Sequence, residues 1–307
     1  MKIVFMGTPD FAVPCLNSLI KDGNEIVGVF TQPDKPKGRG YTMTPPPIKV
    51  LALENNIKVY QPSSLKDEQI LEILKGLAPE MIVVVAYGKI LTKEIIDLPE
   101  YGCVNIHASL LPQYRGAAPI QQAVLDGCKV TGVTAQCMDI GIDTGDILMK
   151  AETEIGENET ADELHDRLSE MGAELIVKVV HAAADGTLAR EKQDESKATH
   201  VGKLTKDMSV IDFTGSAAHI HNQVRGLNSW PSATAVLNGK KIKIHRTLLA
   251  EGKGEPGSVI SLNPLIVACG EGALEITELQ PEGKKRMDSK SFVNGLHITD
   301  AGSLHFS

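Results

Sequence analysis

Two polar side chains, placed two residues apart, give the first indication of chemistry in this sequence. Asn105 and His107 open the segment NIHASLLP, residues 105–112. In a β-strand, side chains two residues apart point to the same face. An amide can stabilise a developing oxyanion and an imidazole can move a proton, so this pair suits acyl transfer. A histidine at a strand end is also common as a structural residue, and the pair alone does not choose between the two roles.

A second polar cluster lies in MDIGIDTGD, residues 138–146, which contains Asp139, Asp143 and Asp146. A buried carboxylate from this loop could hold a histidine in one tautomer and raise its basicity. Two alternatives are a divalent metal site and a tight turn that uses Asp and Gly for backbone reasons. The register of a calcium-binding loop is absent, because the three carboxylates are spaced by four and three residues. The residue types leave these alternatives open.

The elements that must position these groups alternate between strand and helix in the first half of the chain. Strands are predicted at 2–6, 25–31, near 59, and at 81–86, 104–108, 130–138 and 146–155. Helices are predicted between them, and the last, which carries apolar residues from Leu164 to Val179 at helical spacing, ends near Gly186. The pattern predicts an α/β fold with an open, mostly parallel sheet. Asn105 and His107 then lie at the carboxyl end of a strand, where such sheets bind ligands.

The pattern changes near residue 190. The polar stretch at 190–200 predicts a linker, and short strands follow it. Asn238-Gly239 between two strand-like runs is a strong hairpin signal. We therefore expect a catalytic domain over 1–189, a linker over 190–205, and a small OB-like β-barrel domain over 206–307.

The charge distribution limits how the chain could bind nucleic acid. With 31 basic and 39 acidic residues the net charge is −8, which excludes binding by bulk positive charge. The acidity lies in residues 1–205, which carry 20 basic and 29 acidic groups, whereas 206–307 carry 11 and 10. The loop from Gln32 to Lys49 has a local charge of +3. Such a loop is either a solvated turn or a ligand-binding segment.

The amino-acid composition narrows the class of protein further. The chain is 42 % hydrophobic and 23 % charged, as in ordinary globular proteins, and five widely spaced cysteines argue against a disulfide framework or zinc ribbon. The sequence contains neither a membrane-spanning apolar stretch nor the apolar core of a signal peptide. We therefore expect a cytoplasmic protein without membrane association, a structural metal or disulfides, and we expect a monomer.

Two further motifs carry weaker information. In GTPDF, which follows the first strand, Pro9 suits the first position of a helix and Thr8 is a candidate N-cap, but the glycine spacing of a dinucleotide site is missing. His219 and His221 are two residues apart in a predicted helix. Residues at that spacing do not share a helix face, so a metal chelate there is not expected.

Six motifs together resemble the methionyl-tRNA formyltransferase family, and they span nearly the whole chain in the family's order. They are MGTPDFAVP (6–14), QPDKPKGRG (32–40), NIHASLLP with RGAAPI (105–120), DIGIDTGD (139–146), KLTKD (203–207) and RGLNSWPSA (225–233). The NIH and Asp core is shared by all 10-formyltetrahydrofolate-dependent formyltransferases, and the other motifs narrow the resemblance to the tRNA enzymes.

The resemblance implies a Rossmann-like formyltransferase domain with 10-formyltetrahydrofolate as formyl donor and no metal. Asn105, His107 and Asp143 correspond to the family's catalytic trio. The family's folate-contacting segment corresponds to Ser109, Leu110, Leu111 and Pro112. The implied acceptor is the α-amine of initiator methionyl-tRNA, with the product used in translation initiation.

The same resemblance implies contacts to tRNA from Lys35, Lys37 and Arg39 in the basic loop, and from Lys206 and Arg225 in the second domain. An alternative is a folate-dependent formyltransferase that acts on a small amine, such as an amino sugar nucleotide or glycinamide ribonucleotide. A folate- or RNA-binding module without turnover is a third hypothesis, and the intact trio argues against it.

Overall fold

The computed structural model describes residues 1–37 and 41–307, which form two compact units. The first unit contains Met1–Gly116, Thr131–Thr153 and His165–Val201. The second unit contains Ala117–Val130, Glu154–Leu164 and Gly202–Ser307. The chain therefore passes between the units several times before it enters the carboxyl-terminal part.

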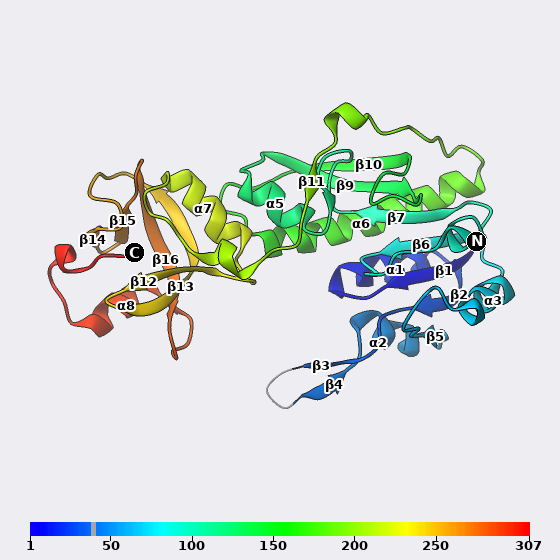
Figure 1. The fold of residues 1–307 in the computed structure, drawn as a ribbon, viewed down its shortest axis with the longest axis horizontal. Coiled ribbons are helices and arrows are strands. Elements are labelled where there is room, and N and C mark those ends of the chain that lie inside the picture. The colour runs from blue at the N-terminus through cyan, green and yellow to red at the C-terminus, as the bar shows by residue number, and fades with distance from the viewer. Residues whose placement is uncertain (38–40) are drawn as a thin grey trace. The chain divides into compact units, whose positions relative to one another are not determined.

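A seven-stranded sheet forms the framework of the first unit, with strand order β10-β9-β7-β6-β1-β2-β5 (Figure 1). The strands are β1 (Lys2–Gly7), β2 (Glu25–Phe30), β5 (Val59–Tyr60), β6 (Met81–Val85), β7 (Cys103–His107), β9 (Val130–Cys137) and β10 (Ile147–Glu154). Four neighbouring pairs, β1–β2, β1–β6, β6–β7 and β2–β5, are parallel, and β7–β9 is antiparallel. The expected mostly parallel α/β sheet is confirmed.

The apolar residues of the strands form the buried interior of the first unit. Every residue of β6 is buried, as expected for a central strand covered on both faces. Helices and short 3-10 turns connect the strands: η1 (Asp10–Ala12), α1 (Val13–Lys21), α2 (Pro47–Glu54), α3 (Glu68–Leu77), α4 (Lys93–Ile96), α6 (Ala161–Ala184) and η2 (Glu195–Lys197). Helix α6 packs so closely on β7 that a Cβ at Gly172 would lie 2.9 Å from Ile106 Cγ2. Ile106 thus faces α6, and its neighbours Asn105 and His107 point to the opposite face.

The start of the first helix differs from the prediction. The 3-10 turn η1 precedes α1, with Pro9 rather than Thr8 at its N-cap. The Thr8 hydroxyl instead donates to Tyr87 O at 3.1 Å and accepts from Gln32 N at 3.4 Å. Thr8 therefore joins the end of β1 to the segments that follow β6 and β2, and the predicted N-cap is wrong because tertiary partners compete for its hydroxyl.

The basic loop contains a hairpin that the sequence did not indicate. Strands β3 (Lys35–Lys37) and β4 (Thr42–Thr44) pair antiparallel, and Figure 1 shows them extending away from the sheet. Lys35 pairs with Thr44 and Lys37 with Thr42 in this register. Arg39 lies outside the described residues.

The second unit is built on an antiparallel sheet, ordered β12-β13-β16-β15-β14 with β17 against β16. Its elements are α5 (Pro119–Leu125), η3 (Lys206–Ser209), α7 (Ala217–Gly226), β12 (Ala233–Leu237), β13 (Lys240–Ala250), β14 (Val259–Leu262), β15 (Leu265–Ala268), β16 (Ala273–Pro281), β17 (Met287–Asp288), α8 (Ser289–Leu296) and η4 (Ala301–Ser303). The hairpin at Asn238-Gly239 is confirmed, and both residues have positive φ, 50° and 75°. Such a turn matches the twist of the strands it joins.

The expected OB-like barrel is confirmed only as an antiparallel sheet domain. The strand path is open, with β12 and β14 at its two ends. The carboxyl-terminal residues bond to both end regions: Val236 N donates to Ser307 O at 2.6 Å, and Phe306 N donates to Gly257 O at 2.8 Å. The described strands alone do not form a closed ladder.

Candidate active site

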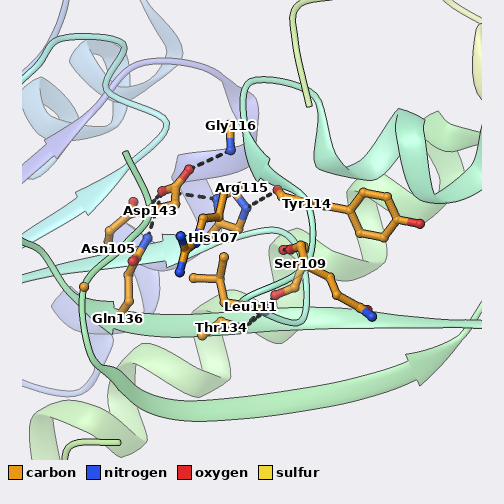
Figure 2. Close-up of polar contacts among 12 residues, drawn as sticks. Asn105, His107, Ser109, Leu111, Tyr114, Arg115, Gly116, Thr134, Gln136 and Asp143 are labelled. Atoms are coloured by element: carbon orange, nitrogen blue, oxygen red, sulfur yellow. Dashed lines mark hydrogen bonds and ion pairs between the residues drawn. The ribbon is translucent and has the colours of Figure 1, made fainter. Parts of the chain in front are cut away.

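The site is built at the carboxyl end of β7, where Asn105 and His107 share one face of the strand (Figure 2). Strand β9 lies beside β7, with Gln136 directly opposite Asn105 and Thr134 opposite His107. Because residues paired across an antiparallel ladder point to the same face, four polar side chains meet on one side of the sheet. The expected placement of Asn105 and His107 is confirmed.

Asp143 joins this group from the loop between β9 and β10. Its Oδ1 accepts hydrogen bonds from Gln136 Nε2 at 2.8 Å and, more weakly, from Asn105 Nδ2 at 3.4 Å. Its Oδ2 accepts from the backbone N–H of Gly116 at 2.9 Å (Figure 2). All three partners donate, and an ionised carboxylate, which only accepts, satisfies them. The Asn105 amide uses one of its two N–H groups in this contact.

His107 is 7 % exposed and lies between two acceptors. Its Nε2 is 2.9 Å from the carbonyl oxygen of Tyr114, and its Nδ1 is 3.6 Å from Asp143 Oδ1. A carbonyl has no proton to give, so Nε2 must carry the hydrogen of that bond. A protonated ring then directs its second N–H toward Asp143. The geometry therefore suits an imidazolium next to a carboxylate.

The segment 109–112, predicted to contact folate, is fixed mainly by Thr134. The Thr134 hydroxyl donates to Ser109 O at 2.7 Å and accepts from Leu111 N at 3.1 Å. Ser109 Oγ donates to Gln113 O at 2.6 Å. The side chains of Ser109 and Leu111 are fully buried, whereas Leu110 and Pro112 are half-buried. The accessible side chains of this segment are thus Leu110 and Pro112.

The five residues predicted to contact tRNA differ in their surroundings. Lys35, on β3, and Lys206, on η3, are exposed. Arg225, on α7, is 6 % exposed, and its Nη1 donates to Gly156 O at 3.2 Å and Glu159 O at 3.1 Å. Burial lowers the pKa of this guanidinium, although nearby Glu159 and Glu157 partly offset the effect. Lys37 lies on β3 and Arg39 outside the described residues.

Four residues of the site were not singled out by the sequence: Thr134, Gln136, Arg115 and Gln193. A signal existed for the first two, because they are polar residues on alternate positions of a strand that is otherwise buried and mostly apolar. Arg115 stands out in the sequence only as part of the RGAAPI motif, and Gln193 lies in the stretch predicted to be a linker. Their contacts depend on chain segments far apart in the sequence, which periodicity does not reveal.

Among residues 1–37 and 41–307, no group of three or more His, Cys, Asp or Glu side chains is arranged to hold a metal ion. Over the same residues, no helix is long and apolar enough to cross a membrane.

The fold and this cluster together are suited to acyl transfer: an amide donor, an imidazole and a carboxylate converge at the ligand-binding edge of an α/β sheet. The Formyl transferase family model matches residues 1–180, and that of the Formyl transferase C-terminal domain matches residues 203–297. The chain therefore belongs to the formyl transferase family.

Comparison with individual proteins shows which members of this family the chain is similar to. The chain is 46 % identical to the methionyl-tRNA formyltransferase of Citrifermentans bemidjiense over 99 % of its own length and 96 % of that protein. It is 48 % identical to the same enzyme of Clostridium novyi, over 97 % and 98 % of the two chains. A sugar 3N-formyl transferase, WlaRD, solved with dTDP and 5-N-formyl-THF, has a similar fold. The TM-score is 0.69 at 22 % identity, over 93 % of this chain and 99 % of that one.

Proposed function

We propose that this protein transfers the formyl group of 10-formyltetrahydrofolate to the α-amine of methionyl-initiator-tRNA, giving N-formylmethionyl-tRNA for translation initiation. The observation that carries the proposal is the convergence of Asn105, His107 and Asp143 at the end of β7. Identity of 46–48 % to methionyl-tRNA formyltransferases over nearly the whole chain supports this choice of acceptor.

The reaction forms a bond between the methionyl nitrogen and the formyl carbon, and breaks the bond from that carbon to N10 of the folate. An α-amine has an ordinary pKa of about 7.7–8.0, so a neutral, nucleophilic fraction is available near neutral pH. Negative charge develops on the formyl oxygen in the transition state. The second N–H of the Asn105 amide and the Nδ1–H of a protonated His107, which is 3.6 Å from Asp143 and not yet hydrogen-bonded to it, can donate to that oxygen, and losing one such donor typically costs about 2.7–4 kcal/mol.

Two protons must also move. The attacking amine releases one and N10 of the leaving folate takes one up. Asp143 and His107 are the neighbouring pair that can accept and return a proton, directly or through a water molecule. Gln136 and Gly116 hold the Asp143 carboxylate in place for this role.

The surroundings of the trio fit a flat, partly apolar donor. Ile140 and Ile142, in the loop that carries Asp143, and Ile90, which follows β6, are large hydrophobic side chains exposed to solvent. Because β6 and β7 are parallel neighbours, Ile90 follows the same edge of the sheet that carries Asn105 and His107. Apolar walls around a few directed polar groups are typical of small-molecule sites. Leu110 and Pro112 supply the accessible part of the proposed folate segment.

We assign folate chemistry to residues 1–189 and tRNA binding mainly to 206–307, with 190–205 lying between them in the sequence. The second part is proposed to be an OB-like barrel, in which the carboxyl-terminal residues bridge the regions of β12 and β14. Exposed Lys35 and Lys206, together with Lys37 and Arg39, supply positive charge for the RNA backbone. Arg225 joins α7 to the distant segment 156–159 by binding the carbonyls of Gly156 and Glu159, and contributes to RNA binding through that support.

An enzyme with this acceptor works where charged tRNA is used, so we assign it to the cytoplasm, without membrane association. The site is assembled within the first unit of one chain, which agrees with a monomer.

One assay tests the activity. The protein is incubated with 10-formyltetrahydrofolate and either methionyl-initiator-tRNA or small amines, namely a nucleotide-linked amino sugar and glycinamide ribonucleotide. The expected product is N-formylmethionyl-tRNA only. Transfer to a small amine with none to the tRNA would establish the alternative enzyme, and folate binding without any transfer would leave a binding module.

A further inference from the structure

The segment expected to be a linker is bonded to the active site. Residues 191–201, named here the strap, begin where Glu191 and Ile147 exchange two backbone hydrogen bonds of 2.7 and 2.9 Å. The strap ends in β11 (His200–Val201), which pairs in parallel with β8 (Arg115–Gly116). A flexible connection would make neither contact, so the strap is part of the first unit.

Gln193 occupies the middle of the strap and uses its whole hydrogen-bonding capacity. Its Nε2 donates to the carbonyl oxygens of Asp143 at 2.8 Å and Gly145 at 2.7 Å. Its Oε1 accepts from Arg115 at Nη2, 2.8 Å, and at Nε, 3.1 Å. An amide has two donor hydrogens and two acceptor lone pairs, and all four are engaged. Gln193 therefore connects the backbone at Asp143 to the Arg115 side chain.

Arg115 is itself held firmly. It is only 1 % exposed, and two of its other donors form a two-fold contact with the Glu195 carboxylate at 2.7 and 2.9 Å. These bonds raise the pKa of Arg115 and lower the pKa of Glu195, so both stay charged. Paired, planar contacts of this kind fix orientation as well as energy. The Gln193 side chain is therefore held in place by a guanidinium that is itself buried and ion-paired.

The loop held by Gln193 has a shape that it would not adopt freely. Asp143 has φ +55°, in the left-handed region that is unfavourable for most residues. A Cβ at Gly145 would lie 1.8 Å from Cys137 O, so only glycine fits there. Gln193 bonds the carbonyls of both residues, which keeps the Asp143 carboxylate directed at Gln136, Asn105 and His107.

The strap supports the histidine in the same way. Tyr114, whose carbonyl bonds His107, also has a left-handed backbone, with φ +59°. Its N–H donates to Thr199 Oγ1 at 2.8 Å. The strap therefore contacts the backbone at Asp143 and also Tyr114, whose carbonyl oxygen binds His107.

We propose that Gln193 is a positioning residue for formyl transfer, acting through the backbone of Asp143. This proposal rests on the function proposed above. Gln193 does not contact the reacting atoms: its four bonds go to Asp143, Gly145 and Arg115. Its loss releases the carboxylate from its place beside His107 without removing any contact to folate or tRNA.

The test compares Gln193→Ala, Gln193→Glu and the control Lys192→Ala, an exposed neighbour on the strap. Gln193→Glu preserves size and the pairing with Arg115 but donates nothing to the two carbonyls. We expect kcat to fall at least about tenfold in both Gln193 variants, since small misplacements of catalytic groups have effects of this order or larger. KM for both substrates should stay within about twofold, and Lys192→Ala should match the wild type.

A second measurement does not depend on activity. Hydrogen exchange of residues 139–146 should accelerate in Gln193→Ala and not in Lys192→Ala. A kcat within about twofold of the control in Gln193→Glu, or unchanged exchange in this loop, overturns the proposal. An inactive wild type with faster exchange in Gln193→Ala refutes the proposed function and leaves the support of the loop intact.

Discussion

The Nδ1 atom of His107 lies 3.6 Å from Oδ1 of Asp143, while Nε2 of the same ring is bonded to a backbone carbonyl. This distance is longer than a hydrogen bond, and a shift of less than an ångström would close it. Catalytic hydrogen bonds are often long before substrates bind and shorten in the complex. The ring is already anchored at Nε2, so we expect any such shortening on the Nδ1 side, where Asn105 and Asp143 meet.

Replacing His107 by alanine removes both the oxyanion donor and the proton carrier. We expect formyl transfer to fall by at least about 10²–10³-fold while folate still binds, because a single lost donor has an effect of that size. Single-turnover transfer and folate titration measure the two quantities. His181→Ala, on an exposed part of α6, is the control. Near-normal turnover in His107→Ala would remove this residue from the chemistry.

The position of Asn105 and His107 was predictable because it depends on local rules. Alternation along a strand sets their common face, and the fully apolar strand at 81–86 identifies the centre of the sheet. Asn238-Gly239 is a similar case, since the turn chemistry lies in the two residues themselves. Each of these features is encoded within a few neighbouring residues.

The rest of the site depends on contacts between distant segments. Asp143 reaches His107 because Gln136, Gly116 and Gln193 hold it, and the last is 50 residues away in sequence. The pairing of β8 with β11 involves two residues on each side, too few for a periodic signal. Composition therefore predicted a linker where the structure has a strap. Arg225 is a similar case. Its positive charge fits an RNA contact, but the structure buries its side chain within the protein.

The basic loop from Gln32 to Lys49 should matter for tRNA binding and not for the formyl-transfer chemistry. We expect Arg39→Ala to raise KM for methionyl-tRNA with little change in folate binding. The dependence of log KM on log salt concentration should weaken by about one unit, as for one lost phosphate contact. Kinetics at several salt concentrations measure this, with Lys66→Ala, an exposed residue before α3, as control. An unchanged KM and salt slope would make this loop a solvated turn.

Lys206 and Arg225 should behave differently although both were predicted to contact tRNA. Arg225→Ala removes a buried side chain together with its bonds to the carbonyls of Gly156 and Glu159, and a hydrogen bond to a charged group typically contributes about 1.5–3 kcal/mol. We expect a clear loss of stability in urea unfolding for Arg225→Ala and none for Lys206→Ala. In a filter-binding assay, Lys206→Ala should bind tRNA more weakly than the wild type, while its stability in urea unfolding stays unchanged. Weaker tRNA binding by Arg225→Ala with unchanged stability would contradict the structural role.

His221 should make the stability of the protein depend on pH. It is 3 % exposed, its Nε2 donates to Glu157 O at 3.1 Å, and its Nδ1 is 2.9 Å from the Thr247 hydroxyl. Burial lowers its pKa below the ordinary 6.5, against a smaller opposing effect of the Glu157 bond. His245 is buried too, and its pKa is lowered by the same cause.

The direction of this pH dependence follows from the order of the two pKa values of His221, which is lower in the folded state than in the unfolded chain. Above pH 6.5 the ring of His221 is neutral in both states, and its burial carries no protonation penalty. As the pH falls below 6.5 the unfolded chain binds the proton first, so the free energy of unfolding decreases until the pH reaches the folded-state pKa. The slope from one histidine is at most about 1.4 kcal/mol per pH unit. Glu163, with a pKa of about 2, loses its contribution only at more acidic pH, below 4.5.

Urea unfolding between about pH 7.5 and about pH 5 measures this slope for the wild type, His221→Gln and the exposed control His219→Gln. We expect the wild type and the control to lose stability in parallel over this range. His221→Gln should lose less, because His221 and His245 are the two histidines whose pKa burial lowers, and one of them is then gone. Equal slopes in all three proteins would mean that His221 takes up its proton in the folded state as readily as in the unfolded chain, and that the Thr247 hydroxyl reorients to accept from it.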